Sequence, residues 1–177
     1  MKFFSGVLFG FFLVGAIVAV VLASGAYNVA ATSLPSKMET RLAQYSLNRS
    51  VALRAPSTKN PVPATPATWK AGLAHYKENC LVCHGAPGVD AGELAAGLNP
   101  PAPDLTLPRV QARPDGELFW IVSNGIRTSG MAAFSPTHKP EEIWHIVSFM
   151  RHLPELTAEE QRALKGGGEQ KAEEPHH

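Results

Sequence analysis

The feature that most constrains this chain is its pair of cysteines, Cys80 and Cys83, which His84 follows directly. A Cys-x-x-Cys pair can form a redox-active disulfide, half of a zinc site, or an anchor for haem. A zinc site would need further ligands, and the sequence contains no other cysteine. A thioredoxin-type disulfide needs a helix that starts at the motif, whereas the helical pattern of residues 69–79 ends there. The histidine that follows therefore favours haem.

The spacing of these three residues suits a porphyrin. Side chains three positions apart at a helix end face the same side, so the sulfur atoms of Cys80 and Cys83 can bond to the two vinyl groups of one haem. His84 then coordinates the iron from one face of the ring. The sequence thus predicts one covalent haem c, held by these three residues, with His84 as an iron ligand.

An uncharged run follows Lys2 and extends to residue 31, and its core, residues 7–23, is almost wholly apolar. A helix of about 20 apolar residues crosses the hydrocarbon layer of a membrane. A cleavable signal peptide usually has an apolar stretch of only about 7–15 residues, although residues 23–26 resemble a cleavage site. We therefore expect residues 1–31 to be an uncleaved transmembrane signal anchor, with Lys2 inside and the rest of the chain exported.

Residues 32–67 are expected to connect this anchor to the next domain as a juxtamembrane helix and a proline-rich linker. Between residues 38 and 53 apolar and basic residues recur as in a short amphipathic helix; they are Met38, Leu42, Tyr45 and Val51, with Arg41, Arg49 and Arg54 interspersed. Such a helix could lie on anionic lipid or on a partner subunit, and an irregular spacer is an equal alternative. The prolines of residues 55–68 favour a semi-rigid extended backbone, and the domain boundary is expected near Thr65.

A haem iron that carries electrons needs a second ligand, and methionine there raises the reduction potential relative to histidine. Met131 stands alone in a loop, where Gly130 lets the backbone approach the ring and the two alanines that follow leave the sulfur unobstructed. Met150 falls in the apolar pattern of a predicted helix and is expected in the core. The two remaining methionines precede the haem-binding segment. We therefore predict Met131 as the second iron ligand.

Histidines are the alternative ligands, although a surface position is the commoner explanation for each of them. The candidates are His75, His138, His145 and His152. His138 is the strongest rival because it shares the loop with Met131. If Met131 were absent from the iron or easily displaced, the chain would be a haem enzyme or a sensor that binds peroxide or a gas. His176 and His177 end a charged, glycine-linked tail that is expected to be disordered.

Residues 69–156 resemble the class I monohaem cytochromes c, in their membrane-anchored bacterial form. Gly72 and Tyr76 are similar to the small and aromatic pair that crosses the last helix in that family, where Trp144 or Phe149 would meet them. The last helix is expected to bury one apolar stripe, formed by Ile143, Ile146, Val147, Met150 and Leu153.

Two loops carry further parts of the resemblance. Residues 97–105 resemble the proline-containing loop whose backbone carbonyl accepts a hydrogen bond from the ligating histidine, and Pro101 is favoured over Pro100 for this haem-contacting role. In the second loop Ala132 stands where the family often has a proline after the ligating methionine. Arg127, close to that methionine, is a candidate to pair with a haem propionate.

The resemblance implies an all-α cytochrome c fold, with short helices and loops wrapped around one haem in residues 68–156. A middle helix is expected over residues 116–126. Thr157 and Glu160 form a capping-box pattern for one more short helix, so residues 157–177 are expected to contain that helix and the disordered tail.

The implied function is electron transfer at the outer face of the bacterial cytoplasmic membrane, because covalent haem is attached outside the cytoplasm. The chain would be a tethered shuttle or the haem subunit of a respiratory or dehydrogenase complex, and no nucleophile–base constellation suggests an enzyme. Its partners would be the membrane and redox proteins. Gly6 and Gly10 have a spacing that lets a second helix approach, although glycine is simply common in membrane helices. A net charge of +1 gives no reason to expect nucleic acid.

Overall fold

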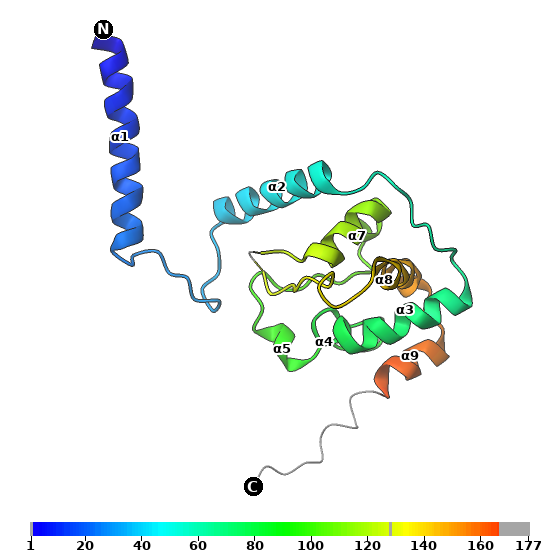
Figure 1. Cartoon of the computed structure of the whole chain (residues 1–177). Helices are drawn as coiled ribbons and strands as arrows, with labels where there is room; N and C mark the ends of the chain where they lie inside the picture. Colours follow the sequence, from blue (N-terminus) through cyan, green and yellow to red (C-terminus); the bar gives the residue numbers. More distant parts are fainter. Residues whose placement is uncertain (1, 128, 167–177) are drawn as a thin grey trace. The chain divides into compact units, whose positions relative to one another are not determined.

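The computed structural model describes residues 2–127 and 129–166, and the regular elements among them are all helical (Figure 1). In chain order they are α1 (Lys2–Ala23), α2 (Lys37–Arg54), α3 (Pro66–Asn79), α4 (Leu81–His84), α5 (Glu93–Ala96), α6 (Pro108–Gln111), α7 (Asp115–Asn124), α8 (Pro140–His152), the 3₁₀ helix η1 (Leu153–Glu155) and α9 (Ala158–Lys165). The prediction of an all-α fold is confirmed. The chain divides into two compact units, residues 1–34 and the part that begins at Pro35.

The first unit contains α1, whose residues Phe3–Ala23 are long and apolar enough to cross a membrane. At a rise of 1.5 Å per residue these 21 residues extend about 32 Å, which matches a hydrocarbon core of about 30 Å. A signal sequence near an N-terminus can meet the same criteria of length and composition. The helix is therefore an apolar N-terminal segment of the kind that serves as an anchor or as a signal.

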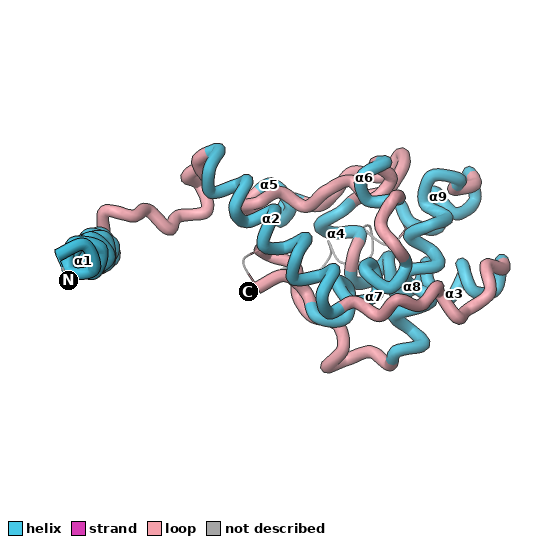
Figure 2. The backbone as a smooth tube through the Cα atoms, turned by 90° about the horizontal axis from the view of Figure 1, so that it is seen from above, coloured by secondary structure: helices cyan, strands magenta, loops and turns pink. Residues whose placement is uncertain are grey.

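Helices α3 and α8 pack against each other at the centre of the second unit (Figure 1 and Figure 2). Gly72 allows their close crossing, because a Cβ atom at this position would lie 2.2 Å from the carbonyl oxygen of His145 and 2.7 Å from Cβ of Phe149. The rings of Tyr76 and Phe149 lie 5.3 Å apart. Phe149 thus meets the small and aromatic pair, whereas Trp144 stacks on a phenylalanine of α7.

The inner face of α8 supplies much of the core. The buried residues of α8 and of the adjoining η1 include every member of the stripe expected from the sequence, namely Ile143, Ile146, Val147 and Met150 on α8 and Leu153 on η1. Each large apolar side chain that is fully buried contributes about 1.5–3 kcal/mol relative to an exposed position. Leu118 and Val122 of α7 join the same cluster. This core fixes α3, and therefore the end of α3 at Cys80, relative to the rest of the unit.

Helix α2 and the proline-rich stretch after it belong to the second compact unit. Val51 on α2 is fully buried, and Asn48 accepts a hydrogen bond of 2.6 Å from the guanidinium group of Arg113. At the start of α7, a Cβ atom on Gly116 would lie 1.8 Å from the carbonyl oxygen of Pro56. The sequence left a helix and an irregular spacer as equal alternatives for residues 38–53, followed by a semi-rigid proline-rich linker. The structure contains the helix, and the stretch after it lies against α7 rather than apart from the domain.

Asn60 fastens the proline-rich stretch to the domain. Its backbone N–H donates to the carboxylate of Asp115 at 3.1 Å, and its side-chain amide donates to the carbonyl of Trp144 at 2.9 Å. Asp115 also accepts from the guanidinium group of Arg151 at 2.7 Å. Burial raises the pKa of Asp115, but the hydrogen bond from Asn60 and the charge of Arg151 outweigh it and hold the pKa below the ordinary value. The proline-rich stretch, α7 and α8 therefore meet at the carboxylate of Asp115.

Helix α9 closes the second unit on the side of α3. Thr157 and Glu160 form the capping box that the sequence predicted at its start. Leu164 is buried, and the ammonium group of Lys77 on α3 donates to the carbonyl of Ala163 at 2.5 Å. The expected tail after this helix, including His176 and His177, lies outside the described residues.

Candidate functional site

The two cysteines lie on one turn of helix. Helix α3 ends at Cys80, whose φ of −107° and ψ of −37° break the regular helix before α4 begins. The backbone N–H groups of Cys83 and His84 then bond back to the carbonyl of Cys80, at 3.1 Å and 2.9 Å. Gly85 ends this turn with a φ of +60°, which residues with a side chain rarely adopt. The break at Cys80 thus produces a separate turn that carries both sulfur atoms and the histidine.

Both thiols are free and half-buried. Burial, followed by the neighbouring Cys83, raises the pKa of the Cys80 thiol to about 12. A disulfide oxidoreductase needs the opposite shift, since its attacking cysteine works as a thiolate with a lowered pKa. The environment of Cys80 therefore does not match that of the attacking cysteine of a disulfide oxidoreductase.

A buried hydrogen bond holds the end of the motif in place. The hydroxyl group of Tyr76 donates to the carbonyl of Gly85 at 2.6 Å. Burial, followed by the nearby Cys80 and Asp104, raises the pKa of Tyr76 far above its ordinary value, so the hydroxyl group stays protonated and can donate. The sequence predicted only that the ring of Tyr76 packs at the crossing with the last helix, and it did not predict the hydrogen bond of the hydroxyl group. A buried tyrosine needs a partner for its hydroxyl group, and that requirement was the available signal.

His84 is held by the backbone of the proline-containing loop. Its Nδ1 atom lies 2.8 Å from the carbonyl oxygen of Pro103, and because a carbonyl only accepts, Nδ1 carries the proton. Burial lowers the pKa of His84, with the Pro103 bond opposing the shift in part, and the net shift is downward. A neutral imidazole with the proton on Nδ1 presents the lone pair of Nε2, which is the form that binds a metal.

The acceptor is Pro103, so the expectation that Pro101 plays this part is corrected. The loop was identified correctly, but which of its carbonyls faces the histidine depends on the course of the backbone. That course includes a cis peptide bond between Asn99 and Pro100, and Pro101 is exposed, whereas Pro103 is half-buried. The neighbouring Leu105 is buried, and its carbonyl accepts from the side chain of Gln111 at 2.7 Å. The loop is therefore pinned to the core just after Pro103.

Met131 lies in the loop after α7, and its side chain packs against the hydrophobic core. The backbone fixes its position through two bonds: its carbonyl accepts from Ile126 at 3.1 Å and its N–H donates to the hydroxyl of Ser129 at 3.2 Å. A Cβ atom on the preceding Gly130 would lie 2.4 Å from a methyl carbon of Leu98. Because Leu98 begins the proline-containing loop, the segment that carries Met131 touches the segment that holds His84.

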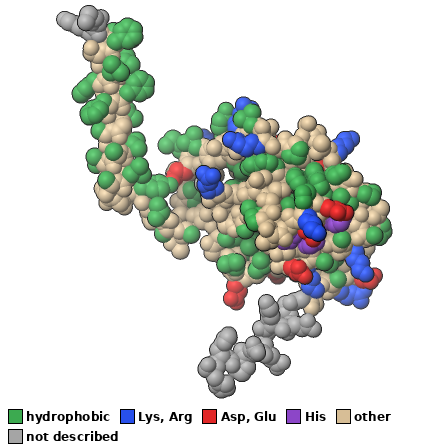
Figure 3. Space-filling model, viewed as in Figure 1, with side chains coloured by type: hydrophobic (Ala, Val, Ile, Leu, Met, Phe, Trp, Pro, Cys, Tyr) green, Lys and Arg blue, Asp and Glu red, His purple; other side chains and the backbone are tan. Residues whose placement is uncertain are grey.

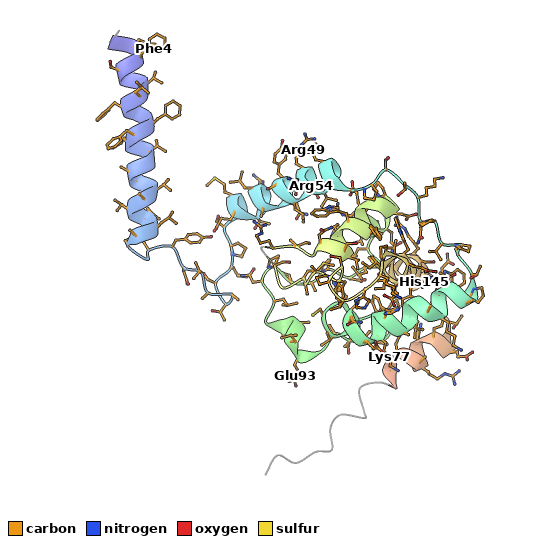
Figure 4. All side chains as sticks on the ribbon, in the orientation of Figure 1. Phe4, Arg49, Arg54, Lys77, Glu93 and His145 are labelled. Carbon is orange, nitrogen blue, oxygen red and sulfur yellow. The ribbon has the colours of Figure 1, made fainter. Side chains whose placement is uncertain are left out.

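Three of the rival histidines make contacts of their own with neighbouring side chains. His138 bonds to the hydroxyl of Thr137 at 2.9 Å through Nδ1, and its ring centre lies 5.2 Å from that of His75. His152 stacks on Trp69 at 3.9 Å and bonds to a glutamate of α9. His145, labelled in Figure 4, is half-buried on α8 beside α3. Arg127 is exposed at the end of the loop before Met131, and its pairing with a propionate stays a prediction.

The fold and this turn define a cytochrome c domain, a class of protein that carries electrons on a covalently bound haem. Residues 67–150 match the family model described as "Cytochrome C oxidase, cbb3-type, subunit III", and this stretch is a domain of that family among the class I cytochromes c. No curated protein matches the chain. The matched residues run from the start of α3 to the last turn of α8, and so contain both loops and the cysteine turn.

Proposed function

We propose that this chain is a membrane-tethered electron carrier whose single haem is held by Cys80 and Cys83, with His84 and Met131 as the iron ligands. The observation that carries the proposal is the fixed imidazole of His84. Its Nδ1 atom is bound to the carbonyl of Pro103, which leaves Nε2 as the metal-binding atom on the same turn as both thiols. A cytochrome c domain implies haem-based electron transfer.

The residues fit the group that the family implies. Haem c supplies the redox chemistry when it is bound, and the protein supplies the attachment, orientation and surroundings. The hydrogen bond to Pro103 fixes the rotation of the His84 ring and makes its Nε2 atom a better donor. The loop that contains Pro103 and the loop that contains Met131 meet at Leu98, and together they would exclude water from one side of the site. With His84 and Met131 both bound to it, the iron would have no open position, which favours electron transfer over catalysis.

An exposed apolar surface beside the motif is the proposed contact for redox partners. Val82, between the two cysteines, is 43% exposed, and Leu94 of α5 is 63% exposed. The backbone N–H of Gly92 donates to the carbonyl of Val82 at 2.9 Å and so keeps α5 next to the cysteine turn. Electrons would enter and leave through this edge, because it brings a partner within a few residues of the thioether bonds. Glu93, labelled in Figure 4, lies at its border.

The proposed arrangement along the chain has an anchor in residues 1–31 and the haem domain in residues 68–156, with residues 32–67 between them. The apolar helix and the cytochrome c domain are consistent with a haem on the periplasmic side of the membrane. The matching family model describes an oxidase subunit, which supports a haem subunit of a respiratory complex beside the tethered shuttle. Purification in mild detergent separates the two, since only a subunit would bring a stoichiometric oxidase, reductase or dehydrogenase with it.

The test of the site is an absorption spectrum of the haem-loaded protein, oxidised and reduced, with and without carbon monoxide. A methionine–iron bond gives the oxidised form a weak red band, which we expect in the wild type and not in Met131→Ala. The reduced wild type should ignore carbon monoxide, and the reduced variant should bind it. Met150→Leu is the matched control, because Met150 lies in the core and its replacement preserves volume.

A wild type without the red band, or one that binds carbon monoxide readily, contradicts ligation by Met131. His138→Ala would then be the next variant, and a haem enzyme or sensor with a displaceable ligand would replace the electron carrier as the better explanation. Loss of covalent haem in the double variant Cys80→Ser, Cys83→Ser tests the attachment separately. Its haem should extract into acidified organic solvent, whereas either single variant keeps one thioether bond and should retain the haem.

A further inference from the structure

Helix α2 carries apolar residues on both of its faces. The inner face holds the fully buried Val51, and Asn48 fixes it to Arg113. The outer face carries four apolar side chains that are between 62% and 70% exposed, namely Met38, Leu42, Tyr45 and Leu53. Their spacings of three, four and eight residues place them along one line of a helix with 3.6 residues per turn. The core of the domain therefore cannot account for this outer stripe.

We propose that this outer stripe, Met38, Leu42, Tyr45 and Leu53, lies in the interface of an anionic lipid bilayer, parallel to its surface. The inference rests on the proposed tether and deepens it, since the lipid would be that of the membrane which α1 enters. An amphipathic helix of this kind buries its apolar face about 5–10 Å into the boundary between headgroups and acyl chains. The opposite face of α2 stays on the haem domain.

The charge of α2 matches an anionic surface. Lys37–Arg54 contains four basic residues and the single acidic residue Glu39, a net charge of +3. Arg49 falls within the apolar stripe, where a long side chain can lie along the lipid and extend its guanidinium group to the phosphates. The space-filling view shows both basic and hydrophobic side chains in the region of α2, and Arg49 and Arg54 are labelled in the side-chain view (Figure 3 and Figure 4).

The chain length between α1 and α2 keeps the helix near the bilayer. The 13 residues 24–36 join the end of α1 to Lys37, and fully extended they span at most about 45 Å. Three apolar residues of this connection are also at least half exposed, namely Tyr27, Val29 and Leu34. Exposed apolar side chains therefore continue along the chain from α1 into α2. A fluid lipid surface can take up this protruding row of apolar side chains whatever its shape, whereas a protein partner would need a groove that matches it.

The helix is formed before it meets lipid. Ser36 caps it, with its hydroxyl group accepting from the N–H of Glu39 at 3.2 Å and the Glu39 carboxylate accepting from the N–H of Ser36 at 2.7 Å. Because the inner face is already ordered on the domain, binding to lipid costs little additional ordering of the backbone. Docking of α2 would also hold the haem domain in one orientation above the membrane, so that a partner in the same membrane meets one edge of it.

The test is the depth of a spin label in full-length, haem-loaded protein inserted into nanodiscs that contain anionic phosphatidylglycerol. Single cysteines are introduced at three positions: Leu42→Cys in the stripe, Gln44→Cys on another exposed side of α2, and Val14→Cys in α1. Each label is compared for its accessibility to oxygen, which concentrates in lipid, and to a water-soluble nickel chelate. We expect labels at 14 and 42 to be shielded from the nickel chelate severalfold relative to the label at 44.

Each result has a definite meaning. A label at 42 that is as accessible to nickel as the label at 44, while the label at 14 is shielded, overturns docking of α2 and leaves the tether intact. An accessible label at 14 contradicts the tether itself. Shielding at 42 that occurs in native membranes but not in pure lipid nanodiscs assigns the stripe to a protein partner and overturns the lipid inference. Equal shielding at 42 in neutral phosphatidylcholine nanodiscs overturns the requirement for anionic lipid.

Discussion

The backbone of α3 at Gly72 touches the backbone of α8 at His145. A Cβ atom on Gly72 would lie 2.2 Å from the carbonyl oxygen of His145, well inside any permitted contact. The neighbouring atom is backbone, so it cannot move aside as the tip of a side chain would. This contact sets the distance between the two central helices and, through α3, the position of the cysteine turn.

We expect Gly72→Ala to lower the free energy of unfolding by about 1–3 kcal/mol, the usual cost of overpacking. Alanine is intrinsically better in a helix by about 1 kcal/mol, but that gain is smaller than the cost of moving α8. Thermal or denaturant unfolding of the haem-loaded protein measures the difference. Gly97→Ala is the matched control, since its nearest neighbour, the carbonyl of Leu94, would lie at an ordinary 3.7 Å. Equal stability of the two variants would show that α3 and α8 can move apart at Gly72 without a loss of stability.

Asn60 provides a second prediction, which concerns the stretch before the haem domain. In Asn60→Ala the carbonyl of Trp144 loses the donor that the Asn60 side chain supplies, and Val62 loses the side-chain acceptor for its N–H group. A net hydrogen bond contributes about 0.5–1.5 kcal/mol, so the loss of two should destabilise the domain by roughly 1–3 kcal/mol. Hydrogen exchange should also rise in residues 55–65. Ser57→Ala, at an exposed position in the same stretch, should change neither quantity, and unchanged exchange in Asn60→Ala would contradict the fastening role.

The sequence was sufficient for the parts of the site that are encoded locally. Cys80, Cys83 and His84 are neighbours in the chain, and Gly72 and Tyr76 follow the helical period, so their arrangement depends on one or two turns. Contacts between distant segments were not accessible in this way. The carbonyl that meets His84 belongs to Pro103 because of the path of a whole loop, and prolines alone do not encode that path.

The proline-rich stretch shows the same limit in another form. Its composition favours an extended backbone, and the backbone after α2 is indeed not helical. Composition does not show that Asn60 bonds to Trp144, or that Gly116 leaves room for Pro56. A spacer and a docked extension have the same local sequence preferences, and they differ only in the partners that the fold brings within reach.

Replacement of the proposed sixth ligand should change the reduction potential. Methionine raises the potential relative to histidine, and axial ligands move haem potentials across a range of about 0.8 V. We expect Met131→His to lower the potential by roughly 0.1–0.3 V within that range. A spectroelectrochemical titration measures it, with Met150→Leu as the control that should stay close to the wild type. A potential that is unchanged in Met131→His would mean that another residue occupies the second face of the iron.

The attachment of α9 should depend on pH through Glu160. Its carboxylate accepts from the N–H and the hydroxyl of Thr157, at 2.8 Å and 2.9 Å, and lies 3.0 Å from Nε2 of His152. Burial raises the pKa of Glu160, but the bonds from Thr157 and His152 outweigh it and hold the pKa below the ordinary value of 4.5. Because the folded pKa is lowered, this stabilisation is complete above about pH 4.5 and is lost as the pH falls through the lower folded value.

We therefore expect the amide protection of α9 to fall selectively below about pH 4.5, while that of α3 persists, once intrinsic exchange rates are corrected for. Glu160→Gln should lose about 1 kcal/mol of α9 stability at neutral pH, since the amide replaces a charged acceptor, and it should remove most of the acid dependence. Glu159→Gln, at the exposed neighbouring position, should keep the acid dependence of the wild type. If Glu160→Gln instead retains the full loss of protection in acid, another carboxylate holds α9 against the domain.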